Sequence, residues 1–219
     1  MNITSDALLT DLYELTMAQA YLAQGMTDIA VFEFFVRKLP PQRNFFMAAG
    51  LEQVLSYLEA FQFSDADIAW LDQTGGFRPA SLNALRAMRF TGEVHAMPEG
   101  SLFFPHEPIL RITAPLPQAQ LVETRVMNLL NFQTMVASKA CRSVLVAGNK
   151  PLIDFGLRRA HGAEAGLLAA RAAYLAGLAG TSNVSAGARF GIPIYGTMAH
   201  SFVQAHLDEA EAFTHIAEA

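Results

Sequence analysis

The sequence predicts an α/β protein. Near the end of the chain, two short strand-like runs, residues 151–155 and 192–195, each end in a cluster of glycine and polar residues that opens a helix. Strands that alternate with helices in this way are typical of βαβ units in a parallel sheet or barrel. The period of the hydrophobic residues changes after Gly148, so we expect an α+β domain over residues 1–148 and barrel-type βα units over residues 149–219.

The first domain is expected to begin with helices around one strand. Apolar residues at helical spacing predict a helix over residues 6–24, with Asp6 as its N-cap and Gly25 as its stop. Residues 27–39 predict a strand, which Pro40 ends. Further helices are expected over residues 48–61, 64–73 and 79–88. Ser64 begins a capping-like sequence at the start of the second.

The middle of the chain changes from strands to long helices. Three strand-like runs lie between residues 92 and 113, and proline and glycine separate them, as in a small antiparallel sheet. Pro117 then opens a long helix with Val122, Val126, Leu129 and Leu130 on one face, and a second helical stretch continues to Ala147.

The last part of the chain predicts only two to three βα units. After the strand at residues 151–155 we expect a helix over 163–178, a loop over 180–183 with a short helix after it, the strand at 192–195 and a helix over 198–206. A complete eight-unit barrel needs ~250 residues on its own. We therefore expect an incomplete barrel.

Composition limits the possible functions. Hydrophobic residues make up 52% of the 219 residues and charged residues only 16%, which predicts a large oligomer interface or a chain that is part of something larger. The net charge of −5 without a basic run argues against nucleic-acid binding. No run is long enough for a membrane span, and the acidic N-terminus does not resemble a signal peptide, so we expect no membrane partner. The single Cys141, in an apolar helical stretch, predicts a core thiol and a reducing cytoplasm.

Two arginines follow the first of the late strands. Arg158 and Arg159 could bind phosphate or carboxylate in a bidentate manner, or could form a structural salt-bridged pair at the strand end. Gly156 and Gly162 favour the first interpretation, because glycine lets the backbone approach a ligand closely. The register of the strand decides which arginine faces the ligand.

Polar residues in two other clusters are candidates for binding or catalysis. His200, next to Ser201, could act as a base, as a nucleophile toward phosphorus or as a structural residue. Thr181 lies in a loop that could hold phosphate oxygens or only cap the next helix. From spacing alone, Asp11 and Tyr13 would be an exposed carboxylate and a half-buried ring. The histidines lack metal-ligand spacing, so no metal site is expected.

Several segments together resemble the nicotinate phosphoribosyltransferase family. The opening LLTDLYELTM (residues 8–17), FEFFVR (32–37), RNF (43–45) and EGSLFFP (99–105) are similar to the N-terminal part of that family. DFGLRR (154–159), RAAY (171–174), GTSNV (180–184) and GTMAHS (196–201) are similar to its core. The resemblance covers essentially the whole chain, and it implies a type II phosphoribosyltransferase architecture with an α+β domain and an irregular α/β barrel.

The resemblance implies a reaction and its participants. Nicotinate attacks 5-phosphoribosyl diphosphate, diphosphate leaves with Mg²⁺, and nicotinate mononucleotide forms for NAD salvage. ATP drives the step through a phosphorylated histidine, which His200 matches. Tyr13 matches the tyrosine that stacks near nicotinate, with Asp11 beside it, and Arg158 matches an active-site arginine. Thr181 and Ser201 match positions near the ligand. Family members are often cytoplasmic homodimers with shared active sites, which implies that Tyr13 and His200 act in different subunits.

The chain departs from the family in its length. Family members continue through further barrel strands, which supply residues for the ribose phosphate, the diphosphate and nicotinate. We therefore expect the chain alone to make little nicotinate mononucleotide. Two alternatives stay open: a non-catalytic remnant that binds ligand or partner subunits, and a relative that acts on quinolinate or nicotinamide. The histidine motif around His200 argues against a quinolinate enzyme, which does not use ATP.

Overall fold

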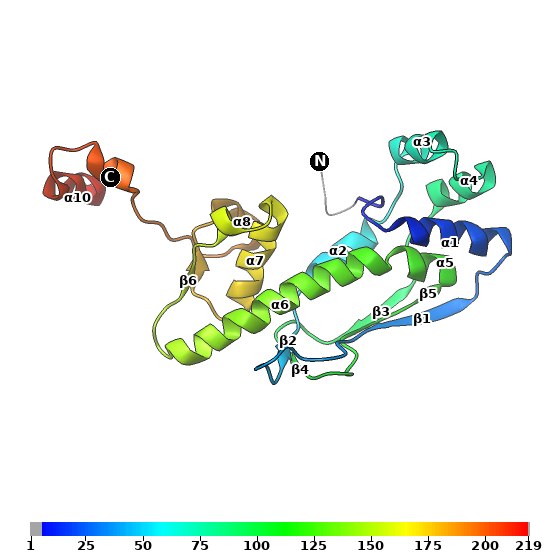
Figure 1. Ribbon diagram of the computed structural model, residues 1–219, viewed down its shortest axis with the longest axis horizontal. Helices are drawn as coiled ribbons and strands as arrows, with labels where there is room; N and C mark the ends of the chain where they lie inside the picture. The colour runs from blue at the N-terminus through cyan, green and yellow to red at the C-terminus, as the bar shows by residue number, and fades with distance from the viewer. Residues whose placement is uncertain (1–5, 219) are drawn as a thin grey trace.

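The computed structural model describes residues 6–218 and shows an elongated molecule built along one long helix, α6 (Glu123–Ala147) (Figure 1). Residues 12–121 form an N-terminal body around the first part of α6, and residues 153–195 form a βα unit that packs on its second part. Residues 196–218 form a C-terminal segment that extends away from both. The mixed architecture confirms the predicted α/β class.

The first helix is shorter than predicted. Helix α1 spans Leu12–Ala23, with Asp11 as its N-cap and Gln24 as its C-cap. The prediction of a helix from Asp6 was wrong, because the carboxylate of Asp6 accepts a hydrogen bond from the backbone N–H of Leu8 at 3.0 Å. An aspartate that bonds its own backbone two residues on forms a turn that competes with the helix.

A three-stranded antiparallel sheet forms the floor of the N-terminal body. Its order is β1 (Ile29–Phe34), β5 (Leu110–Pro115) and β3 (Glu93–Ala96), with Ile29 opposite Pro115 and Glu93 opposite Thr113. The strand predicted over residues 27–39 is therefore limited to the six residues that pair with β5. Successive residues of β1 alternate between exposed and half-buried, as expected for a sheet with one covered face.

A second, two-stranded pair lies at the edge of the body. Strand β4 (Leu102–Phe103) pairs with β2 (Phe46–Met47), a strand that the sequence did not predict. The runs predicted between residues 92 and 113 thus divide between two sheets instead of forming one. Helix α2 (Leu51–Glu59) begins later than expected because Gly50 has a φ of 107°, outside the helical region.

Helices cover the body, and their apolar faces form its core. Helix α3 (Asp65–Gln73) begins at Ser64 with the predicted capping arrangement, and Asp67 completes a reciprocal capping box. Helix α4 (Pro79–Ala87) and α5 (Leu116–Leu121) both begin at or beside a proline. The predicted apolar face of the long helices is buried, since Val122, Val126, Leu129 and Leu130 are each 3% exposed or less. Cys141 also lies in the core, as expected.

The βα unit contains a parallel pair of strands, of which the sequence predicted only the first. Strand β6 (Ile153–Asp154) leads through the 3₁₀ turn η2 (Leu157–Arg159) into α7 (Ala163–Leu175), and β7 (Gly180–Thr181) pairs with β6 in parallel. The prediction of a loop over residues 180–183 was wrong at β7, whose parallel partner is distant in sequence. Helix α8 (Val184–Phe190) follows, capped by Asn183. The strand predicted over residues 192–195 is reduced to one parallel bridge, between Thr181 and Ile194.

The C-terminal segment carries two helices. Helix α9 (His200–Gln204) is shorter than the predicted helix over 198–206, and α10 (Glu209–Glu218) was not predicted. In Figure 1 both lie away from the βα unit, at the far end of the molecule from α1. In the part of the chain that the structure describes, no helix combines the length and the hydropathy that crossing a membrane requires. Helix α6 contacts both the body and the βα unit, so the domain boundary at residue 148 stays a prediction.

Candidate functional site

A pocket lies where the parallel strands of the βα unit end. The carboxyl ends of β6 and β7 meet at one edge, as parallel strands do, and the cavity there has a volume of about 780 Å³. We call it the strand-end pocket. It is lined by residues that follow β6, β7 and the bridge at Ile194: Phe155, Leu157, Arg158, Arg159, Ser182, Val184, Ile194, Tyr195, Gly196 and Thr197.

Arg158 and Arg159 both line the strand-end pocket. They lie in the η2 turn directly after β6, and both side chains are exposed. Among residues 6–218, neither guanidinium forms an ion pair, so the structural salt bridge considered from the sequence is not formed here. Because a guanidinium offers several N–H donors in a fixed plane, two such groups at one pocket can bind a phosphate or a diphosphate.

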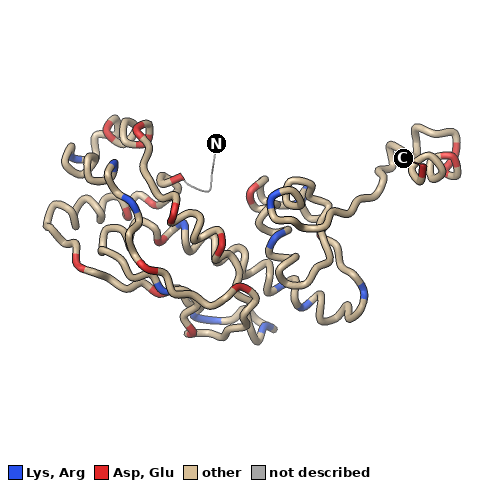
Figure 2. Tube along the Cα trace, turned by 180° about the vertical axis from the view of Figure 1, so that it is seen from behind, with Lys and Arg blue, Asp and Glu red and all other residues tan. Residues whose placement is uncertain are grey.

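The βα unit and the second part of α6 carry more basic than acidic residues. Basic residues are concentrated along the second part of α6 and the βα unit, whereas the charged residues of the C-terminal segment are acidic (Figure 2). A concentration of one sign of charge around a pocket attracts ligands of the opposite sign. The basic residues of this region are Lys139, Arg142, Lys150, Arg158, Arg159, Arg171 and Arg189, against the acidic Asp154 and Glu164. Of these, only Arg158 and Arg159 line the pocket, and Arg171 is paired with Glu52 and Glu99 of the N-terminal body.

Thr181 lies behind the strand-end pocket. Its side chain is fully buried, its Oγ1 donates a hydrogen bond to Asp154 Oδ2 at 2.8 Å, and the same Oγ1 accepts one from the N–H of Asn183 at 3.0 Å. The next residue, Ser182, lines the pocket instead. Successive residues of a strand point to opposite sides, so a shift of one residue separates a structural hydroxyl from a pocket hydroxyl. Ser182 lies in the loop predicted to hold phosphate oxygens, but Thr181 was the site residue predicted there. Tyr195, which ends the predicted strand over residues 192–195, was missed.

Glycine at position 156 has a local explanation. The N–H of Gly156 donates a hydrogen bond to Asp154 Oδ1 at 2.9 Å, and a Cβ at Gly156 would lie 2.9 Å from that same oxygen. Gly162 has a φ of 104° at the start of α7, in the region that favours glycine. Both glycines therefore serve the turn that presents the arginines.

His200 and Ser201 lie outside the lining of the strand-end pocket. Both are exposed at the start of α9, and the pocket reaches only Gly196 and Thr197 in the segment between the bridge at Ile194 and α9. The structure thus brings the arginine pair together with the beginning of the histidine motif, but not with the imidazole of His200.

Asp11 and Tyr13 lie in the N-terminal body, beside the first turn of α6. The Tyr13 hydroxyl donates a hydrogen bond to Glu123 Oε1 at 3.3 Å, and Asp11 Oδ2 accepts one from Thr124 Oγ1 at 2.8 Å. The Tyr13 ring is 45% exposed. Partial burial raises the pKa of Tyr13, the Thr124 hydroxyl lowers it, and the nearby Glu123 carboxylate raises it further.

Tyr13 and the arginine pair are far apart within one chain. Figure 1 shows α1 and β6 on different sides of the molecule, separated by α6. A helix of 25 residues is roughly 37 Å long at 1.5 Å per residue. The two groups of predicted site residues therefore form separate surfaces in this chain.

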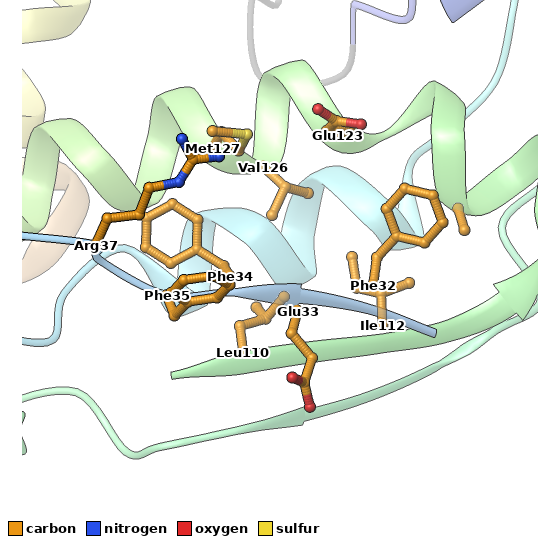
Figure 3. A pocket seen from close by; sticks show the side chains of 11 residues that line it. Phe32, Glu33, Phe34, Phe35, Arg37, Leu110, Ile112, Glu123, Val126 and Met127 are labelled. Carbon is orange, nitrogen blue, oxygen red and sulfur yellow. The ribbon is translucent and has the colours of Figure 1, made fainter. Parts of the chain in front are cut away.

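A second cavity lies beside Tyr13, between β1 and α6. It has a volume of about 540 Å³ and is lined mainly by apolar side chains of the sheet and the helix, with Glu123 on α6 and Arg37 beyond β1 at its rim (Figure 3). Phe32 and Phe34 point into it because alternate residues of β1 face the helix. Arg37 and Glu123 were not among the site residues predicted from the sequence, although the FEFFVR segment belongs to the family resemblance.

Two protein-family models match the chain. The model of the nicotinate phosphoribosyltransferase N-terminal domain matches residues 8–131, and the nicotinate phosphoribosyltransferase family model matches residues 151–218. The chain belongs to the nicotinate phosphoribosyltransferase family. This confirms the resemblance seen in the sequence.

Individual members of the nicotinate phosphoribosyltransferase family are also similar to this chain in sequence. Nicotinate phosphoribosyltransferase pncB2 of Mycobacterium tuberculosis (strain ATCC 25618 / H37Rv) is 54% identical over 207 residues, which cover 94% of this chain and 45% of that protein. The nicotinate phosphoribosyltransferase of Bacillus subtilis (strain 168) is 45% identical over 213 residues, 97% of this chain and 44% of that protein. This chain thus spans less than half the length of these relatives.

Solved structures confirm the predicted architecture. The crystal structure of human nicotinic acid phosphoribosyltransferase matches with a TM-score of 0.83 and 43% identity, over 90% of this chain and 40% of that chain. A nicotinate-nucleotide pyrophosphorylase from Pyrococcus furiosus has the same fold, with a TM-score of 0.78 at 24% identity over 97% of this chain and 47% of that one. The mixed α/β fold is therefore that of the type II phosphoribosyltransferases.

Proposed function

We propose that this chain carries part of a nicotinate phosphoribosyltransferase active site. The reaction transfers phosphoribose from 5-phosphoribosyl diphosphate to nicotinate and gives nicotinate mononucleotide and diphosphate for NAD salvage, driven by ATP. The observation that supports this most strongly is the strand-end pocket, with two guanidiniums free of ion pairs with described residues, in a member of this family.

Arg158 and Arg159 are proposed to bind the anionic part of the phosphoribosyl donor. As the bond between ribose and diphosphate breaks, negative charge builds on the leaving oxygen, and fixed cations stabilise it. Their place on a short turn between β6 and α7 supports this role, because both ends of the turn are held by regular structure. Ser182 and the N–H groups at the strand ends can donate further hydrogen bonds.

His200 is proposed to accept the γ-phosphoryl group of ATP. An imidazole nitrogen would form a bond to phosphorus as the bond from phosphorus to the leaving ADP breaks, so the attacking nitrogen must carry a free lone pair. Its exposure at the start of α9 leaves the ring accessible to a nucleotide, and Ser201 is proposed to contact the same ligand. Thr181 is proposed to act indirectly, by holding Asp154.

Tyr13 and Asp11 are proposed to serve the strand-end pocket of a second subunit. The exposed face of the Tyr13 ring suits a flat pyridine, and its distance from the arginines of its own chain supports a shared site in a homodimer. Mg²⁺ is proposed to arrive with the phosphates of the substrates, since that ion is often held by one or two carboxylates together with substrate phosphates. Among residues 6–218, no group of three or more potential metal-ligating side chains is present.

Labelling with γ-³²P-ATP tests the proposal for His200. We expect the protein, incubated with nicotinate, Mg²⁺ and γ-labelled ATP, to acquire an acid-labile phosphate that is absent in His200→Ala. The matched control is His161→Ala, since His161 is also exposed but lies outside the motif. Equal labelling of wild type and His200→Ala would contradict the assignment of His200 as the phosphorylated residue.

A turnover assay separates the enzyme from a protein that only binds ligand. With 5-phosphoribosyl diphosphate, nicotinate and ATP, we expect this chain alone to form little nicotinate mononucleotide while it still binds the phosphoribosyl donor. Robust turnover by these 219 residues would show that they suffice for the reaction. The absence of both turnover and donor binding would contradict the proposed function.

A further inference from the structure

The turn that carries the arginine pair rests directly on helix α7. A Cβ at Gly166 of α7 would lie 2.5 Å from Leu157 Cδ1, so the helix and the η2 turn are in close contact at this point. Any movement of α7 relative to the rest of the protein would therefore move Arg158 and Arg159.

Arg171 joins α7 to the N-terminal body. Its side chain is buried, and it donates to Glu99 from Nη1 at 2.9 Å and from Nη2 at 2.7 Å, in a bidentate pair. It also donates from Nε to Glu52 Oε2 at 3.1 Å. Arg171 belongs to the βα unit, whereas both carboxylates belong to the body, so this ion pair crosses between the two.

Glu99 also holds the start of helix α2. Its Oε1 accepts hydrogen bonds from the N–H groups of Gly50 at 2.6 Å and Leu51 at 3.1 Å. Burial alone would raise the pKa of Glu99, but the hydrogen bonds from Arg171 and from Gly50 outweigh it and hold the pKa below its ordinary value. The carboxylate is therefore charged at neutral pH, and both of its oxygens accept hydrogen bonds.

A second ion pair fixes the same face of α7. Glu164 lies seven residues before Arg171, two helical turns away, and accepts a hydrogen bond from Arg125 Nη2 of α6 at 2.5 Å. Arg125 is fully buried and also donates to Asn128 at 2.7 Å. Helix α7 contributes the carboxylate to one pair and the guanidinium to the other. A reversed or shifted helix would therefore bring like charges together.

We propose that Arg171 is a positioning residue of the strand-end pocket. Through its ion pair with Glu99 it sets the place of α7, and through α7 it orients the turn that carries Arg158 and Arg159. The inference rests on the proposed function only in taking these arginines as anion-binding groups.

The test compares variants that break the ion pair with and without leaving an unpaired charge on Glu99, and both keep the cap of α2. Arg171→Met leaves Glu99 buried and unpaired, whereas the double variant Glu99→Gln with Arg171→Met removes both charges and keeps an oxygen that accepts from Gly50 and Leu51. Arg171→Lys keeps the charge without the bidentate geometry. The matched control is Arg189→Met, because Arg189 is exposed on α8 and forms no ion pair with a described residue.

Two measurements are made on each variant. Hydrogen exchange is followed at the amides of Arg159 and Ala160, which bond to Gly156 and Leu157 within the turn. Affinity for inorganic diphosphate is measured by calorimetry. We expect both the single Met variant and the double variant to exchange faster at these amides and to bind diphosphate roughly tenfold more weakly, in the range usual for coupled sites. Arg171→Lys should recover part of both losses.

The outcomes distinguish the inference from the proposed function. Exchange and affinity in the double variant equal to those of the wild type, while Arg158→Ala weakens diphosphate binding, would overturn the positioning role alone. If Arg158→Ala binds diphosphate as well as the wild type does, the anion role fails, and the exchange at Arg159 and Ala160 then decides the positioning role. The positioning role of Arg171 would also be overturned if the double variant lost no more affinity for diphosphate than Arg189→Met does.

Discussion

Thr181 Oγ1 donates a hydrogen bond to Asp154 Oδ2 at 2.8 Å, across the two parallel strands β6 and β7. The other oxygen of Asp154 accepts the N–H of Gly156 at 2.9 Å, so this carboxylate links the second strand to the turn that precedes the arginine pair. The relationship makes Thr181 part of the framework of the strand-end pocket.

Replacement of Thr181 by valine should therefore reduce stability. Valine keeps the volume but leaves Asp154 Oδ2 and the N–H of Asn183 without their partner, which costs about 1–3 kcal/mol. Urea denaturation of Thr181→Val measures the loss, and Ser182→Ala is the control because Ser182 lies on the pocket side. An unchanged free energy of unfolding in Thr181→Val would show that the bond does not support the unit.

The ion pair of Glu99 predicts a loss of stability in acid. The folded-state pKa of Glu99 lies below its ordinary value of 4.5, so its contribution is complete above that pH and disappears as the pH falls through the lowered pKa. Unfolding free energies of wild type and Glu99→Gln should therefore differ most near neutral pH and converge as the pH falls from 4.5 through the lowered pKa. A difference that grows as the pH falls would contradict the sign of the shift.

Glu14 should give the opposite pH dependence. Its side chain is fully buried, and burial raises its pKa even though hydrogen bonds from Thr10 and Thr124 oppose the shift. A raised folded-state pKa means that stability is complete below the ordinary value and declines as the pH rises through the folded value. Relative to Glu14→Gln, the wild type should lose stability as the pH rises above 4.5 and through the raised folded-state pKa. A gain over that range would refute the assignment.

A homodimer is the expected oligomer. Tyr13 lies far from the strand-end pocket of its own chain, and several large apolar side chains are exposed, among them Ile29, Val31 and Leu102. Sedimentation equilibrium should give twice the chain mass of 23.8 kDa at micromolar concentration. A monomer throughout would exclude an active site shared between subunits.

Local signals in the sequence predicted the helices well and the short strands poorly. Ser64 with Asp67, and Pro79, marked helix starts correctly because their interactions are within one turn of the chain. Strands β2 and β7 have two residues each, and their partners are distant in sequence, so no local period reveals them. Asp6 was misread because one aspartate can either cap a helix or close a turn.

The candidate site was predicted in part. The sequence placed Arg158 and Arg159 at a strand end, and the structure puts both in one pocket. Whether Thr181 or Ser182 faces that pocket depends on strand register, which a two-residue strand does not encode. The ion pair between Arg171 and Glu99 could not be predicted, because it joins residues 72 positions apart through tertiary packing.

Binding of 5-phosphoribosyl diphosphate to the arginine pair tests the central claim most directly. Calorimetric titration should show that Arg158→Ala and Arg159→Ala each bind at least about tenfold more weakly than the wild type, because each loses charge-assisted hydrogen bonds. Arg189→Ala should bind as the wild type does. Equal affinity in all four proteins would contradict the assignment of the strand-end pocket as the site of the phosphoribosyl donor.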